Sequence, residues 1–179
     1  MRYASAALLL LTLAASAAQP RAIDVVRSNA QFTVQHIWVE HVSGTVPILS
    51  GSLVLVPGSA IPLSATAAFD ATRISTGEPD RDRSLESPDF FDSAKFPRWT
   101  FASTQIIPEG TAAFEMDGVL TIHGVAQPER LQVSVDGSVD APRYHATGHI
   151  DRHAFGMATT RLDSTIGGTA DVTLDIVLK

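Results

Sequence analysis

LESPDFFDSAKFPRWTFAST, residues 85–104, constrains the architecture of this chain more than any other stretch. Phe90 and Phe91 lie there among charged and polar residues, and an alternating run typical of a strand begins at Trp99. From residue 75 to residue 98 the sequence shows no strand pattern, which predicts an unusually long loop. Loops longer than about 12–15 residues are usually either functional or disordered. A solvated linker has no use for large apolar side chains. We therefore expect a lid that packs against an apolar surface.

The first 18 residues are typical of a secretory signal peptide. Arg2 supplies the positive end, residues 6–14 form a short apolar segment, and the small residues 15–18 offer a cleavage site. The apolar segment is too short to span a bilayer, and no later segment approaches such a span. We expect a chain that does not span a membrane and that is exported to the periplasm or secreted.

The composition excludes several classes of protein. The chain has no cysteine, which excludes disulfide bonds, thiol catalysis and thiolate metal sites. Its formal charge is −6 and it has no basic cluster, so we expect neither nucleic acids nor anionic membrane surfaces as partners. Residues 19–179 show no internal repeat, and they suffice for one hydrophobic core. We therefore expect a single domain.

Apolar residues alternate with polar ones along most of this domain, which is typical of half-buried β-strands. In the first such run, one face carries Phe32, Val34, His36 and Trp38. The other candidate strands begin at Trp99 or cover residues 42–56, 63–72, 112–123, 131–135, 144–152 and 172–178. About eight strands of this kind predict an all-β antiparallel sandwich or closed barrel with one interior.

The predicted inward faces contain many small residues, among them Ala65, Ala67, Gly118, Ala146 and Gly148. Small inward side chains in a barrel of about eight strands leave room for an elongated apolar guest. Glycines in strands also mark bends and points of close contact in a tightly coiled barrel. The residues alone leave both interpretations open.

The histidines do not predict a metal site. His145, His149 and His153 recur every four residues, but on a strand four residues span about 13 Å. Zinc lies only about 2 Å from its ligands, so neighbouring members of this series cannot share an ion. We expect them to face solvent, and we expect no cofactor. His36 differs because it shares an apolar face, where it needs a hydrogen-bond partner or offers a polar contact to a ligand head.

No motif predicts an enzyme. The chain has no GxSxG nucleophile elbow and no glycine-rich phosphate loop after a strand. The charge-balanced residues 80–83, DRDR, are consistent with a solvated turn. Alternatively, Arg81 and Arg83 could bind a phosphate or carboxylate at the mouth of a cavity.

Five blocks, in order, resemble motifs of the YceI-like family of bacterial periplasmic proteins. The blocks are FTVQH at 32–36 with Gly44, STG at 75–77 with Arg81, Asp82 and Leu85, residues 85–104, VLTIHGV at 119–125 with Pro128, and Ile150 and Arg152 with FGM at 155–157. Together they cover nearly all of the chain from Ile23 onward. The sequence departs from the family pattern at residues 37–41 and 46–48.

The resemblance implies an extended, lipocalin-like antiparallel barrel of about eight strands, with one or two short helices in a long lid loop. It also implies a tunnel that holds a polyisoprenoid, an isoprenoid quinone or a similar long-chain lipid, bound without chemical conversion. The expected cavity and lid residues are Phe32, Val34, Trp38, Phe69, Phe91, Trp99, Phe101, Leu120, Ile122, Phe155 and Met157. His36 and Arg152 are the candidates for contact with the polar head.

Two other classes of function remain open at this point. One is an exported stress or interaction module with a filled core and no ligand. The other is a hydrolase or metal-dependent enzyme whose catalytic groups converge from distant positions. A homodimer is also compatible with the sequence.

Overall fold

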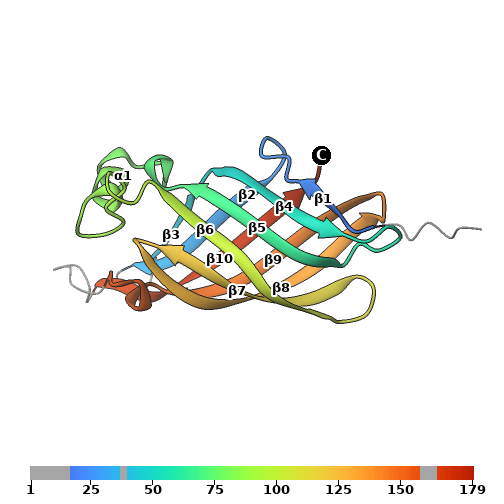
Figure 1. Cartoon of the computed structure of the whole chain (residues 1–179). Helices are drawn as coiled ribbons and strands as arrows, with labels where there is room; N and C mark the ends of the chain where they lie inside the picture. The colour runs from blue at the N-terminus through green and yellow to red at the C-terminus, as the bar shows by residue number, and fades with distance from the viewer. Residues whose placement is uncertain (1–16, 37–39, 158–164) are drawn as a thin grey trace, which may run out of the picture.

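The computed structural model describes residues 17–36, 40–157 and 165–179, and one antiparallel sheet dominates it (Figure 1). Its strands are β1 (Gln19–Ala22), β2 (Asn29–His36), β3 (Glu40–Thr45), β4 (Ile48–Leu55), β5 (Pro62–Asp70), β6 (Arg98–Pro108), β7 (Ala113–Ile122), β8 (Val125–Ser138), β9 (Ala141–Asp151) and β10 (Ile166–Val177). They are hydrogen-bonded in the order β1-β4-β5-β6-β7-β8-β9-β10-β2-β3. The predicted all-β antiparallel fold is therefore confirmed.

The described residues form ten strands, where the sequence predicted about eight. One extra strand is β1, which lies between the predicted signal peptide and the first predicted strand. The other arises because the predicted strand over residues 42–56 is divided between Thr45 and Ile48. Pro47 causes this division, since proline has no N–H to donate to a ladder.

The division of this strand also closes the sheet into a barrel. β3 is one edge strand and pairs with β2, whereas β4 lies beside the other edge strand, β1, and pairs with β5, so one continuous segment connects the two sides of the sheet. At the junction the Val46 N–H donates to the Ala30 carbonyl (3.1 Å), and the Pro47 carbonyl accepts from the Asp70 N–H (2.9 Å). The result is an elongated barrel with α1 at one end and β1 at the other (Figure 1).

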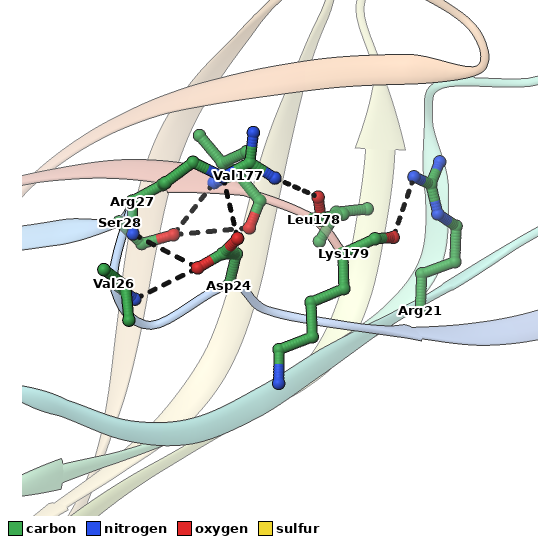
Figure 2. A network of polar contacts seen from close by, with 8 residues as sticks. All are labelled: Arg21, Asp24, Val26, Arg27, Ser28, Val177, Leu178 and Lys179. Carbon is green, nitrogen blue, oxygen red and sulfur yellow. Dashed lines mark hydrogen bonds and ion pairs between the residues drawn. The ribbon is translucent and has the colours of Figure 1, made fainter.

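Residues 21–28 and the C-terminal residues 177–179 close the barrel near β1. The Asp24 N–H donates to the Val177 carbonyl at 2.8 Å, and the Ser28 hydroxyl accepts from the Val177 N–H at 2.9 Å. Arg21 donates to the Lys179 carbonyl at 3.2 Å, as Figure 2 shows. These bonds connect residues 21–28 to residues 177–179, and we call this end of the barrel the floor.

The lid covers the opposite end. It runs from residue 71 to residue 97 and contains a 3-10 turn, η1 (Ala71–Arg73), and one α-helix, α1 (Pro79–Glu86). The predicted lid with a short helix is confirmed. Asp82 of α1 accepts from the Ser75 hydroxyl (3.0 Å) and the Thr76 N–H (2.7 Å), which anchors the helix to the preceding turn.

A second 3-10 turn, η2 (Arg152–Phe155), follows β9 at the same end of the barrel as the lid. Residues 1–16 of the predicted signal peptide lie outside the described residues. Among the helices that the structure describes, none has the length and apolar character needed to cross a membrane.

Candidate ligand-binding site

The barrel encloses a cavity of about 460 Å³, within the usual range of small-molecule sites. Most side chains that line it are apolar, and they come from both halves of the barrel wall and from the lid. The alternation of the strands produces this lining, because every second residue points inward. The interior is therefore not filled by the protein's own side chains.

Both interpretations of the small inward residues are correct, each for a different residue type. The alanines Ala65, Ala67 and Ala146 line the cavity and leave it open. The glycines instead mark close contacts. A Cβ at Gly118 would collide with the Phe101 ring, and one at Gly148 would lie 2.6 Å from a Leu131 methyl carbon.

Most of the predicted ligand-binding residues line this cavity. Those that do so are Phe32, Val34, His36, Phe69, Phe91, Trp99, Phe101, Leu120, Ile122, Arg152 and Met157. Phe155 is not among the lining residues, because it is fully buried within the η2 turn. Trp38 lies outside the described residues. Contact of any of these side chains with a ligand stays a prediction.

The lid places aromatic rings over the cavity. The Phe91 and Trp99 ring centroids are 4.6 Å apart, and Phe90 is buried beside them. Leu85 and Arg81 of α1 also line the cavity, and Arg81 donates to the Thr76 hydroxyl oxygen at 2.8 Å. One of the two arginines of the DRDR segment therefore lies at the cavity mouth.

Aromatic side chains also seal the floor. Phe114 and Tyr144 pack with their ring centroids 6.3 Å apart, and both are buried. The Tyr144 hydroxyl donates to the Ala60 carbonyl at 2.9 Å. Burial raises the pKa of Tyr144 from 10 to about 12, which extends the pH range over which its hydroxyl stays protonated and able to donate.

His36 and Arg152 lie in the lining in different ways. His36 Nδ1 is buried, lies 3.7 Å from a Glu40 carboxylate oxygen, and has no hydrogen-bond partner among the described residues. Arg152 donates to the carbonyls of Met157 (2.5 Å), Ile166 (3.0 Å) and Gly167 (2.8 Å). Its guanidinium thereby connects the end of η2 to the start of β10.

Sequence reasoning missed one inward carboxylate. Glu129 on β8 lines the cavity on the same face as Leu131 and Val133. Burial raises the pKa of its carboxyl group above the ordinary value, and the negative charge of Asp151 raises it further. Extending the alternation of residues 131–135 back by two positions would have placed Glu129 inward.

The three histidines of the four-residue series, His145, His149 and His153, are exposed as the spacing indicated. His145 and His149 on β9 are exposed, and each lies 2.7 Å from an aspartate on β10, Asp175 and Asp171 respectively. His153 is also exposed, but it belongs to η2 and not to a strand. Within the part of the chain that the structure describes, no group of three or more His, Asp or Glu side chains could hold a metal ion.

An antiparallel barrel with an apolar cavity beneath an aromatic lid defines a lipocalin-like binding fold. The YceI-like domain model matches residues 22–178, and the chain belongs to that family.

Relatives of this family are 27–28% identical to the chain over the aligned residues. A UPF0312 protein from Enterobacter sp. (strain 638) is 28% identical over 84% of this chain and 82% of its own length. Protein YceI of Escherichia coli O157:H7 is 28% identical over 72% of this chain and 70% of its own. A UPF0312 protein of Vibrio parahaemolyticus is 27% identical over 64% of this chain and 61% of its own length.

Solved structures share the fold at lower identity. BcnA of Burkholderia cenocepacia superimposes with a TM-score of 0.79 at 21% identity, over 88% of this chain and 99% of that one. A domain from Saccharophagus degradans, described as polyisoprenoid binding and implicated in plant cell wall breakdown, gives a TM-score of 0.67 at 16% identity. That match covers 88% of this chain and 97% of the domain.

Proposed function

We propose that this protein binds a long-chain apolar lipid of the polyisoprenoid or isoprenoid-quinone type and carries or stores it without chemical conversion. The cavity of about 460 Å³ with its apolar lining is the observation that carries this proposal. Each methylene group that a guest buries contributes about 0.8 kcal/mol, so a long chain binds without needing specific polar contacts.

The family match and the polyisoprenoid-binding neighbour from Saccharophagus degradans support a binding protein over an enzyme. We also propose that residues 1–18 are removed as a signal peptide and that residues 19–179 form one exported, periplasmic or secreted domain. The match of a single domain model over residues 22–178 supports this division.

Native mass spectrometry of the full-length gene product, purified from a periplasmic extract without detergent, tests these proposals. We expect a polypeptide mass that lacks the first 17 or 18 residues, plus a discrete added mass that organic extraction releases as an isoprenoid lipid. A ligand-free mass that stays unchanged after incubation with such lipids would contradict lipid binding and favour a filled interaction module.

A pair of variants tests the location of the guest. Ala67 lines the cavity, whereas Ala102 on the neighbouring strand β6 is exposed and does not line it. In a true cavity the Ala67→Phe side chain occupies free space, so the variant should fold but no longer bind lipid. The Ala102→Phe variant should fold and still bind lipid. Equal lipid content in the two variants would place the guest elsewhere.

A further inference from the structure

The barrel wall is split between β8 and β9 near the lid. The two strands pair from Ser138↔Ala141 to Leu131↔Gly148, and no pair follows among the described residues. β8 nevertheless continues to pair with β7 as far as Ile122↔Val125. β9 likewise continues to pair with β10 as far as Thr169↔Asp151. Both strands therefore stay in the sheet while they separate from each other.

A proline lies within the split. Pro128 belongs to the separated part of β8, where its missing N–H removes one possible ladder hydrogen bond. Gln127 makes the polar contact that spans the gap at the lid end, where its side-chain amide donates to the Ala154 carbonyl of η2 at 2.7 Å.

The side chains of Arg130 and His149, at the two margins of the split, contact residues on the outer neighbouring strands, β7 and β10, and not each other. Arg130 donates to Asp117 on β7 at 2.6 Å and lies 2.8 Å from Glu115 on the same strand. On the other margin, His149 lies 2.7 Å from Asp171 on β10. The positive charge of Arg130 is therefore already matched by two carboxylates.

Glu129 occupies the split itself. With His149 it lines both the inner cavity and an outer groove of about 400 Å³, so Glu129 belongs to the part of the wall between the two spaces. β7 places Gly118 opposite Glu129, and the apolar Phe101 ring occupies the space where a side chain of residue 118 would lie. No hydrogen bond or ion pair of Glu129 occurs within the described residues, so its oxygens are available as acceptors.

We propose that Glu129, at the split between β8 and β9, accepts a hydrogen bond from the polar head of the bound lipid and selects its chemistry. A carboxylate accepts from a hydroxyl, phenol or amide N–H, and it repels a phosphate or a second carboxylate. The favoured ligand is then a long apolar chain that ends in a neutral hydrogen-bond donor. This inference rests on the proposed function, because it assigns the head group of the same guest.

The groups that surround Glu129 agree with this selectivity. Asp151, on the β9 side of the split, adds a second negative charge that disfavours an anionic head. Arg152, a cavity-lining cation that follows Asp151 in the chain, already donates to three backbone carbonyls. Burial also raises the pKa of Glu129, because its charge is poorly solvated without a partner. A donating head group would supply that partner.

Three probes with one shared chain test the inference: geranylgeraniol, geranylgeranyl methyl ether and geranylgeranyl phosphate. Their affinities for the delipidated protein are measured near neutral pH through quenching of tryptophan fluorescence, since Trp99 lines the cavity. We expect the alcohol to bind about tenfold more tightly than the ether, the ratio that one hydrogen bond to a charged group supplies. The phosphate should bind most weakly.

Two variants and a control isolate the carboxylate. Glu129→Val should bring the affinities for alcohol and ether together, whereas Glu129→Gln should keep the preference for alcohol and weaken the exclusion of phosphate. Glu109→Val, in the exposed turn between β6 and β7, should leave all three affinities unchanged.

The outcomes separate this inference from the proposed function. If the wild-type protein binds the three probes and Glu129→Val keeps the wild-type ratios, the head group does not contact Glu129 and the inference is overturned alone. If none of the probes binds to the wild-type protein, lipid binding itself fails and the inference fails with it.

Discussion

The floor and the lid close the same barrel by different means. At the floor, Phe114 and Tyr144 are almost fully buried, and backbone hydrogen bonds attach the start of the chain to β10. At the lid, α1 has no buried residue of its own and depends on side-chain bonds to Asp82. Regions with few buried contacts open locally at low free energy. Because the structure describes no buried residue in α1, we expect a bound lipid to enter and leave at the lid end.

The largest effect should come from removing an aromatic side chain from the floor. Phe114 is 1% exposed, so Phe114→Ala leaves a cavity that costs about 3–5 kcal/mol of unfolding free energy. Phe91→Ala is the matched lid variant, and its loss should be smaller because that ring is half-buried. Urea unfolding of ligand-free protein measures both. Equal losses would mean that the two ends are equally well packed.

A smaller effect should follow from releasing the lid helix. Asp82→Ala removes the acceptor of the Ser75 and Thr76 bonds and should cost about 1 kcal/mol of unfolding free energy. Lipid release should become faster, and backbone amides of residues 75–86 should exchange hydrogen sooner. Asp89→Ala, at an exposed lid position, is the control. Unchanged release and exchange would show that Asp82 does not hold the lid.

The lid anchor should also weaken in acid. Burial opposes ionisation of Asp82, but hydrogen bonds from Thr76 and Ser75 outweigh it and lower its pKa below 3.8. The stabilisation is therefore present above pH 3.8 and is lost as the pH falls through the lowered value. The difference in amide exchange rate between Asp82→Ala and the wild-type protein should therefore become smaller as the pH falls over that range.

The smallest effect concerns the split near the lid. Because the pKa of Glu129 is raised above 4.5, the folded state binds its proton more tightly than the unfolded state does. This group therefore favours folding below pH 4.5, and that contribution is lost as the pH rises through the raised value. Glu129→Gln should raise the Tm at pH 7, and the gain should vanish in acid. A gain independent of pH would mean that the charge of Glu129 is well solvated.

Particular residues show where sequence reasoning succeeded. Phe32 and Val34, and likewise Leu120 and Ile122, were assigned to inward faces from their spacing alone, and all four line the cavity. The alternation failed where an expected element was bounded wrongly. The strand at residues 131–135 begins at Val125 in the structure, so Glu129 was not considered. Phe155 was selected from the family resemblance and not from alternation; it belongs to the η2 turn, is fully buried and does not line the cavity.

By itself the sequence determined the strand faces and the lid with its aromatic residues, whereas the division of the strand at Pro47 was recognised only in the structure. The faces and the lid follow from local properties: side chains alternate along a strand, and the lid segment lacks that alternation. The tertiary structure alone decided that the barrel keeps an open cavity and that β8 and β9 separate beside Glu129. Both depend on which distant segments meet and how completely their side chains fill the space between them, and neither quantity is a property of any single stretch of chain.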